Sequence, residues 1–508
     1  MKRTTLFLLF SCCIHYVLSQ TYFFGDLQSR YQLDKVYFFE SNNHTISKPY
    51  WVSEKQDTLR QLGVWEYAES MDTMKVKILP IIGAKMNADL NPSTITNTLQ
   101  FGAQINSQHK NGFSSQVRLG YQLGALSNYE ILQIDKRPFA PGIGYLSDSS
   151  EKTYSKPLIE GVVNYQPNQY FIFSTGIGKQ FLGDGYRSLW LSDYAPTFPF
   201  LKMESTFWKA KYVNLWTLHN DQHTQLFNQR KWSSLHLLSL NVADWLNLSV
   251  FESIVWQGRD TLNNRGFDIN YINPFVFYRP VEYGIGSADN SFMGAGVKFT
   301  FAKHYVLYGN IVLDEFLLSE VRDNRGWWGN KYGVQFGLKC FDLFGLEGLY
   351  TITEWNAVRP FTYSHMTSMQ NYGHKNHSLA HPLEANFMEA LTLIGFQKGN
   401  FDFLFQYHYQ FFGKDFQNKN YGGDMFNSYN DRVNNNYAFG HTIGQGNTID
   451  QQVINARLSW MLMPLTNTKI FTQFNYRYTL QRNNNVLRQS YLFNFGITSN
   501  LWQSYLDY

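Results

Sequence analysis

Three kinds of stretch in this 508-residue sequence carry residues that could do chemistry: a glycine and lysine run, a set of histidines, and loops rich in aromatic and polar side chains. The first is "TGIGKQFLGDGYRSLWLSDYAPTFPF" (175–200). A Walker-type phosphate loop needs a glycine five positions before its Gly-Lys pair and Ser or Thr after it. Phe173 and Gln180 occupy those positions, so the run does not predict a nucleotide site.

The histidines are His365, His374, His377 and His381, and the spacing of the last three could suit a transition metal. No carboxylate or cysteine pattern accompanies them, so we expect solvated or loop-packing histidines and neither a metal nor another cofactor. Ser and Asp lie near histidine elsewhere, as in "TLHNDQHTQ" (217–225), but no framed nucleophile motif such as "GxSxG" occurs. We therefore expect a protein that is not an enzyme.

The loops are "RDNRGWWGNKYG" (322–333), "TEWNAVRPFTYSH" (353–365) and "INPFVFYRPVEYG" (272–284). Aromatic rings beside Asn, Arg and Asp suit a sugar polymer, since a pyranose offers C–H faces for stacking and hydroxyls for polar partners. The competing interpretation is an interfacial aromatic girdle with loop packing. The candidate polysaccharide-binding residues are Asp184, Arg187, Trp327, Trp328, Trp355, Asn356, Arg359 and Tyr363.

The N-terminus predicts export. Residues 1–19 have a basic start, an apolar stretch "TTLFLLFSCCIHYVL" and a small residue before Gln20, as in a cleaved signal peptide. A lipoprotein signal with Cys12 as the lipidated residue is the weaker alternative. The exported chain keeps only Cys340, so no intramolecular disulfide is expected. The net charge of +4 does not indicate nucleic-acid binding.

No further window has the 18 or more apolar residues that a membrane helix needs, yet 18% of the residues are aromatic. Instead the polarity alternates with a period of two, as in 99–108 and 113–123 on either side of "HKNG". One face suits lipid and the other suits water, which predicts an all-β transmembrane outer-membrane barrel. Seventeen strands are expected at 76–86, 99–109, 113–124, 157–165, 170–180, 206–217, 233–243, 247–256, 292–301, 305–314, 333–342, 346–355, 387–397, 401–412, 450–463, 469–481 and 486–499.

The parity of the crossings predicts one more strand. Between the short turns "QPN" (166–168) and "DWLN" (244–247), both expected in the periplasm, the chain must cross the membrane an even number of times, but only three strands are apparent. The missing crossing must lie in 181–205, giving about 18 antiparallel strands. Because Pro196 and Pro199 cannot donate ladder hydrogen bonds, we expect 183–190 to bend at or into the lumen and the crossing after it to be irregular or bulged.

These patterns divide the chain into three expected regions: a signal peptide (1–19), a short helical periplasmic segment (20–74) and the barrel (75–508). Ser53 is a plausible N-cap, and "LRQLGVWEY" is apolar at helical spacing, so one or two short helices are expected there. The Asn- and Gly-rich region 417–447 predicts a long external loop.

Several long runs resemble the Wzi-like capsule assembly family, and its branch from gliding bacteria that includes the gliding-motility protein RemB. They are "HTISKPY" (44–50), "GKQFLGDGYRSLWLSDYAPTFPFLKMESTFWK" (178–209), "NLSVFESIVW" (247–256), "INPFVFYRP" (272–280) and "EWNAVRPFTYSH" with "NYGHKNHSLAHPLEANF" (354–365 and 371–387). The resemblance implies an outer-membrane barrel of eighteen strands with a periplasmic helical bundle and a lectin-like role.

The leading hypothesis is therefore a barrel in the cell outer membrane that binds or tethers capsular or other surface polysaccharide, with outer-membrane lipid around it. The gliding branch suggests the alternative of an adhesion or motility component with other outer-membrane or motility proteins as partners. A diffusion porin is the third possibility, because the inward positions, mostly Gln, Asn, Ser and Gly, do not decide whether the lumen is open.

Overall fold

The computed structural model describes residues 21–23, 27–40, 43–52, 69–71, 74–91, 93–128, 130–131, 139–140, 144–145, 153–221, 229–259, 265–274, 289–433, 438–463 and 468–499. The expected signal peptide and the helical pattern that follows Ser53 lie outside these residues, as does most of the aromatic run 272–284.

Within these residues, eighteen antiparallel strands form a closed barrel. They are β5 (Met74–Leu90), β6 (Ser93–His109), β7 (Phe113–Ala125), β10 (Thr153–Tyr165), β11 (Phe171–Gly178), β13 (Phe198–Phe207), β14 (Ala210–Asp221), β15 (Gln229–Ala243), β16 (Leu246–Gln257), β17 (Asn290–Phe301), β18 (Tyr305–Glu315), β19 (Lys331–Phe341), β20 (Leu349–Val358), β23 (Phe387–Lys398), β24 (Phe401–Lys414), β25 (Asn447–Met463), β26 (Thr468–Gln481) and β27 (Val486–Thr498).

Each strand pairs with its neighbours in the chain, and β27 pairs with β5 to close the ring. The short β4 (Glu69–Met71) also pairs with β5. The fold class expected from the sequence is thus confirmed, and each expected strand overlaps a barrel strand. The extra crossing is β13, which lies in the stretch that parity indicated. The expected strand at 206–217 had merged the end of β13 with β14 across the tight turn at Trp208 and Lys209.

The outer wall is apolar. Outward positions carry exposed side chains such as Ile82, Phe101, Leu119, Phe336 and Phe495, each between 49% and 59% exposed. Inward positions on the same strands carry Gln104, Arg118, Gln335 and Asn494, as the alternation of a strand requires. Among the described residues no helix is long and apolar enough to cross a membrane. A closed barrel with this exterior is a protein of the outer membrane.

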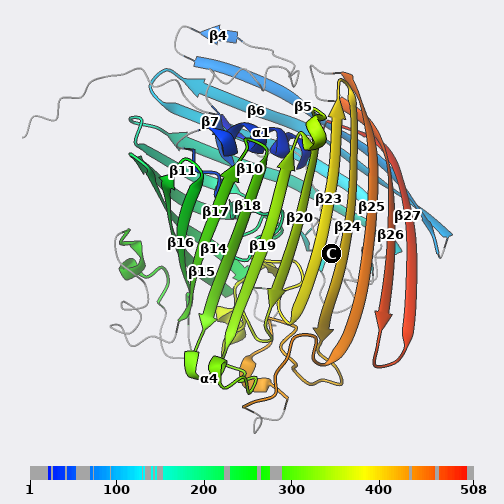
Figure 1. The fold of residues 1–508 in the computed structure, drawn as a ribbon. Coiled ribbons are helices and arrows are strands. Elements are labelled where there is room, and N and C mark those ends of the chain that lie inside the picture. The colour runs from blue at the N-terminus through cyan, green and yellow to red at the C-terminus, as the bar shows by residue number, and fades with distance from the viewer. Residues whose placement is uncertain are drawn as a thin grey trace, which may run out of the picture.

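The two ends of the barrel differ in their connections (Figure 1). Short turns join β6 to β7, β10 to β11, β13 to β14 and the corresponding later pairs at one end. Long loops emerge at the other end, including those with α4 (Leu318–Arg322) and with the run 415–446 between β24 and β25. Barrels of this kind place short turns in the periplasm, so the long-loop end faces outward.

The N-terminal segment lies inside the barrel near the short-turn end. In α1 (Leu27–Phe39), Asp34 accepts a hydrogen bond of 2.6 Å from inward-facing Lys339 of β19, and Lys35 pairs with Asp342 in the turn after β19 at 2.7 Å. Figure 1 shows α1 within the ring of strands, at the end opposite α4. Farther along, β2 (Ser47–Lys48) pairs with β12 (Phe181–Leu182). The remaining short pair here is β1 (Thr21–Phe23) with β3 (Tyr50–Val52).

A hydrophobic core occupies the lumen from its middle toward the long-loop end. It joins Ile46, Trp190 and Tyr363 to inward-facing barrel residues such as Phe251 of β16. The Trp190 ring stacks on Phe251 with centroids 5.2 Å apart. The chain between β11 and β13, the loop between β20 and β23 and the N-terminal segment all supply apolar side chains to this core, so the lumen is packed at this level.

The bend of 183–190 into the lumen is confirmed by these contacts, but the expected irregularity of the following strand is wrong. β13 pairs in unbroken register with β11 over Phe198–Ser205 and with β14 over Phe200–Phe207. Pro199 is accommodated because it lies at the start of the strand, before the ladder with β14 begins.

One loop covers the outside of the barrel. The 3₁₀ helix η2 (Ile269–Ile272) lies against outward-facing side chains of β14, β15 and β16, where Trp216 Nε1 donates to the Tyr271 carbonyl at 2.9 Å. Tyr271 itself is fully buried against Ile254 and Trp256.

Candidate functional site

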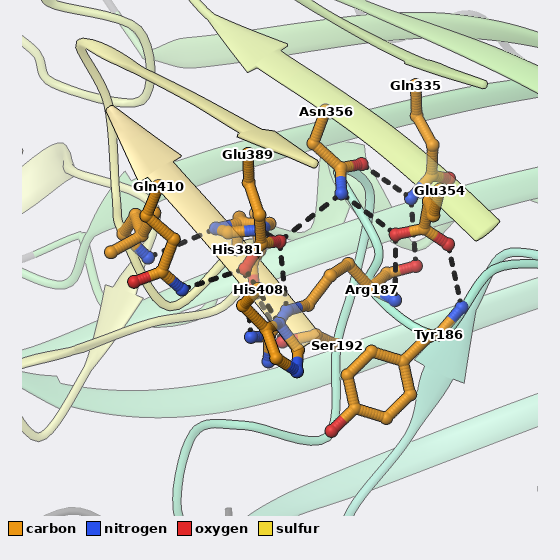
Figure 2. Close-up of polar contacts among 12 residues, drawn as sticks. Tyr186, Arg187, Ser192, Gln335, Glu354, Asn356, His381, Glu389, His408 and Gln410 are labelled. Carbon is orange, nitrogen blue, oxygen red and sulfur yellow. Dashed lines mark hydrogen bonds and ion pairs between the residues drawn. The ribbon is translucent and has the colours of Figure 1, made fainter. Parts of the chain in front are cut away.

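A buried polar network in the lumen is centred on Glu389 of β23 (Figure 2). Arg187 donates through Nε and Nη2 to the two carboxylate oxygens at 3.2 and 3.1 Å, the fork geometry typical of Arg and carboxylate. His381 Nε2 lies 2.7 Å from Glu389 Oε2, and Gln410 donates to Oε1 at 2.9 Å. His408 Nδ1 lies 3.4 Å from Oε1. The carboxylate is thus surrounded by hydrogen-bonding partners.

A second carboxylate, Glu354 of β20, anchors the inward bend. It accepts hydrogen bonds from the backbone N–H groups of Tyr186 and Arg187 at 2.8 and 3.2 Å. Tyr308 donates to it at 2.7 Å, and Asn356 at 2.8 Å. A Cβ at Gly185 would lie 2.6 Å from the Arg187 carbonyl oxygen and 2.4 Å from Glu354 Oε2, so glycine is needed for this approach. The network therefore fixes the run 183–190 against the barrel wall.

Asp184 belongs to a neighbouring group of contacts with the N-terminal segment. Thr45 Oγ1 donates to Asp184 at 2.6 Å and accepts from Lys298 Nζ of β17 at 2.6 Å. Lys48 donates to the Gly183 carbonyl at 2.7 Å. Burial lowers the pKa of Lys48 well below its ordinary value, although Asp34 and Asp184 oppose the shift.

The long-loop end holds a different group, which we name the loop-end aromatic cluster: Trp327, Trp328, Phe361, Tyr429 and Arg432. The Trp328 and Tyr429 ring centroids are 5.0 Å apart, and the Arg432 guanidinium lies 4.4 Å from the Trp328 ring. Phe361 is buried beneath Trp328, whereas Trp327 and Trp328 are each only partly buried. This is an aromatic surface with cationic groups beside it at the outward end of the barrel.

Backbone contacts hold this cluster in place. The Trp328 N–H donates to the Ala438 carbonyl at 3.0 Å, which joins the loop after β18 to the loop after β24. Arg359 donates to the carbonyls of Asn330 at 2.8 Å, Trp327 at 3.2 Å and His441 at 3.3 Å. Arg359 thus positions the cluster through backbone carbonyls.

The eight candidates from the sequence do not form one site. Arg187 and Asn356 meet in the lumen network, Asp184 lies against the N-terminal segment, and Trp327, Trp328 and Arg359 come together at the long-loop end. Trp355 points outward from β20, is 39% exposed and stacks on Phe336 at 6.2 Å, so it belongs to the membrane-facing wall. Tyr363 is fully buried and donates to the Leu189 carbonyl at 2.7 Å.

The four loop histidines are also dispersed. His365 contacts Tyr429, His374 accepts from the Asn220 N–H at 3.2 Å, and His377 lies 2.7 Å from the Lys375 carbonyl. His381 belongs to the Glu389 network. Within the described part of the chain no group of three or more His, Cys, Asp or Glu residues is arranged to hold a metal ion.

The two carboxylates at the centre of the lumen contacts described above, Glu354 and Glu389, were not among the sequence candidates. Each is a single carboxylate on an inward position of an alternating strand, the pattern of a water-facing residue. Tyr429 and Arg432 were hidden in the Asn- and Gly-rich loop, whose composition predicted only a loop.

No protein-family model matches the sequence, and neither does any curated protein. Solved structures with similar barrels include Wzi of Escherichia coli, described as an outer-membrane, carbohydrate-binding β-barrel involved in group 1 capsule assembly. It is 11% identical over 84% of this chain and 85% of its own, with a TM-score of 0.48. OccAB2 of Acinetobacter baumannii is 9% identical over 84% and 98%, with a TM-score of 0.46. OprD of Pseudomonas aeruginosa is 10% identical over 86% and 95%, with a TM-score of 0.43.

Proposed function

We propose that this outer-membrane barrel binds surface or capsular polysaccharide at its long-loop end and tethers it to the cell. The observation that supports this is the partly open pair Trp327 and Trp328, held by two loops beside Arg432. A sugar ring packs its C–H face on an indole, while its hydroxyls accept hydrogen bonds from guanidinium groups.

The rigidity of the loops favours binding. The Trp328 N–H is hydrogen-bonded to the Ala438 carbonyl, and Arg359 donates a hydrogen bond to the Trp327 carbonyl. Because these bonds already order the two loops, little conformational freedom is lost when a glycan binds to the rings. Arg325, 49% exposed, lies 4.3 Å above the Phe439 ring nearby and adds a second cation beside an aromatic face. A polymer could contact both positions at once.

The packed lumen argues against a diffusion channel. A porin keeps a water-filled passage, whereas here Trp190, Phe251 and Tyr363 belong to one hydrophobic core inside the barrel. The polar groups next to this core, including Arg187 and Glu389, are engaged with one another. Recognition at the outer surface is therefore the function that these residues support best.

The test is glycan binding by Trp328→Ala and by the matched control Trp355→Ala. Both remove one partly exposed indole, but only Trp328 lies in the loop-end aromatic cluster. We expect Trp328→Ala to weaken binding at least roughly tenfold, as for loss of a central aromatic contact, and Trp355→Ala to leave it unchanged. Binding is measured by co-sedimentation with polysaccharide from the same cells and on a glycan array.

Absence of binding by the parent protein, or equal binding by both variants, would contradict the proposal. Deletion of the gene, scored by capsule staining and by surface spreading, distinguishes capsule tethering from an adhesion or gliding role. Loss of stained capsule with normal spreading supports tethering, and loss of spreading with a normal capsule supports the gliding role.

A further inference from the structure

A segment of loop on the outside of the barrel, residues 265–274, lies against the wall that should face lipid; we name it the outer strap. It contains η2 and contacts β14, β15 and β16 from outside the ring (Figure 1). On the short-turn side of it, outward-facing Leu238 of β15 and Val250 of β16 are 43% and 49% exposed. Such residues form the apolar belt that meets lipid. The outer strap adjoins this belt on its long-loop side.

The wall behind the outer strap is unlike a surface that meets lipid. Outward-facing Ile254 and Trp256 are fully buried together with Tyr271 of the strap. His236 and Glu252 also occupy outward positions and are buried, with Nδ1 and Oε2 3.7 Å apart. Ionisable side chains are costly on the lipid face of a barrel. Lipid therefore does not contact this part of the wall, although it contacts the same strands nearer the short turns.

Side chains of the wall bind the backbone of the outer strap. Four outward-facing residues donate hydrogen bonds to its carbonyl groups: Trp216 and Ser234 to Tyr271 at 2.9 and 3.0 Å, Trp256 to Gly266 at 3.2 Å, and Tyr212 to Pro274 at 2.5 Å. Irregular backbone is tolerated at membrane depth only where its polar groups are bonded within the protein. These bonds meet that condition for the three carbonyls and hold the strap on the wall.

Polar side chains of the outer strap are bonded within the protein as well. Arg265 donates to Asp268 at 2.6 Å and to both oxygens of Asp289, just before β17, at 2.9 and 2.8 Å. The Tyr271 hydroxyl donates to Asp289 at 2.7 Å. The backbone and side-chain amides of Asn270 donate to Asp268 at 2.9 and 2.8 Å. The polar groups are thus drawn toward the wall and toward the start of β17.

The side of the outer strap that faces away from the wall is rich in apolar side chains. Phe267, Ile269 and Ile272 are 36%, 73% and 45% exposed. They lie on the same strands as the belt formed by Leu238 and Val250, and extend it toward the long-loop end.

We propose that the outer strap is embedded in the outer leaflet of the membrane, where Phe267, Ile269 and Ile272 contact the acyl chains of lipid. It replaces the wall as the lipid-contacting surface over β14–β16. Lipid is favoured over a partner protein because this surface is continuous with a belt that lipid already covers. The aromatic run 272–284, which the sequence suggested as a sugar-binding loop, then begins in the membrane. The surface shares no residue with the loop-end aromatic cluster, so the two proposals can fail separately.

The test is the environment of a nitroxide label on the full chain in phosphatidylcholine vesicles, with Cys340→Ser in every variant. The label is attached to Ile269→Cys in the strap, to Val250→Cys in the belt, or to Asn430→Cys, an exposed position in a long loop. Collisions with oxygen, which dissolves in hydrocarbon, and with a neutral nickel chelate, which stays in water, are measured by electron paramagnetic resonance. Heat-dependent mobility on gels confirms that each variant is folded.

Because a polar complex enters hydrocarbon only at high cost, nickel collisions at Ile269 and Val250 should be at least roughly tenfold fewer than at Asn430. Oxygen collisions at Ile269 should match those at Val250. Nickel collisions at Ile269 equal to those at Asn430 would place the strap in water and overturn the proposal. Few collisions with either reagent at Ile269, or spin–spin broadening between copies, would show that protein covers the strap and would overturn lipid as its partner.

A second pair of variants tests the bonds from the wall. Trp216→Phe keeps an aromatic ring but removes the donor to the Tyr271 carbonyl, so nickel collisions at Ile269 should rise. The matched control is Trp245→Phe, at an outward tryptophan near the short turns that is 56% exposed, and it should leave them unchanged. Equal collision rates in both variants would overturn the wall donors as the anchor of the strap.

Discussion

Arg187 and Glu389 form an ion pair that is almost completely shielded from solvent, at 2% and 0% exposure. Such a pair depends on its additional hydrogen bonds, because desolvation of two charges cancels much of their attraction. Here His381 and Gln410 bind the carboxylate, and Gln335 donates to the Arg187 carbonyl at 3.1 Å. The pair fixes the inward bend to β23 and specifies its position in the lumen.

Arg187→Met should therefore destabilise the barrel strongly. It leaves the Glu389 carboxylate buried without its cation, and loss of one partner of a buried pair costs about 3–5 kcal/mol. The control is Arg325→Met at the pair with Glu320, whose arginine is 49% exposed and which should cost no more than about 1 kcal/mol. Urea unfolding in lipid, followed by gel mobility, measures both. Equal effects of the two variants would contradict a stabilising role for the lumen pair.

Arg187 could be selected from the sequence because it lies in an unusual glycine- and aromatic-rich stretch that parity placed within the barrel. Its partner could not, since one glutamate in "FMEAL" alternates like any lumen-facing residue. Trp355 shows the opposite difficulty, because it was selected from the sequence but lies on the outer wall. Its neighbours Glu354 and Asn356 face inward, since adjacent residues of a strand point to opposite sides of the wall.

At the scale of elements, the N-terminal segment is held in the lumen by polar contacts that depend on protonation. His44 Nδ1 lies 2.8 Å from Ser239 Oγ of β15, and the nearby charges are Lys211, Lys298 and Asp184. Burial and then the two lysines lower the pKa of His44 to about 3. The imidazole is therefore neutral in the docked segment at neutral pH.

Acid should loosen this segment. Once undocked, His44 has an ordinary pKa of about 6.5, so the undocked state binds more protons between about pH 6.5 and 3. Docking is fully favourable above that range and weakens as the pH falls through it. Protease cleavage within 27–50, measured from pH 7 to 4, should rise for the parent and rise less for His44→Gln. The same rise in both proteins would exclude His44 as its cause.

The periodicity of the sequence was sufficient for the barrel strands because each places alternate residues in lipid and lumen. It was insufficient for β13, where Pro196 just before the strand and Pro199 at its second position argued against the regular ladder that forms. It also could not show that α1 lies within the ring, since the contacts of Asp34 with Lys339 and of Tyr31 with Tyr350 join residues hundreds of positions apart.

At the scale of the whole molecule, chain packs inside the lumen at two levels: the N-terminal segment near the short turns and the inward-folded chain around Trp190 and Tyr363. The intact barrel should therefore show little single-channel conductance in planar bilayers, far below that of an open barrel of eighteen strands.

Deletion of residues 21–50 should leave the conductance low, because the second level remains. Heat-dependent gel mobility confirms that the deletion variant is folded before it is measured. A porin-sized conductance in the intact protein would contradict closure altogether, and one that appears only after the deletion would show that the N-terminal segment alone closes the lumen.

The docked N-terminal segment also constrains the order of assembly. It precedes the first barrel strand, yet it contacts β15, β17 and β19 from within, and the ring is completed only when β27 meets β5. A segment held on many sides cannot easily be threaded into a finished ring. β27 and β5 must therefore pair late in assembly, after the N-terminal segment has already docked against the inward faces of β15, β17 and β19.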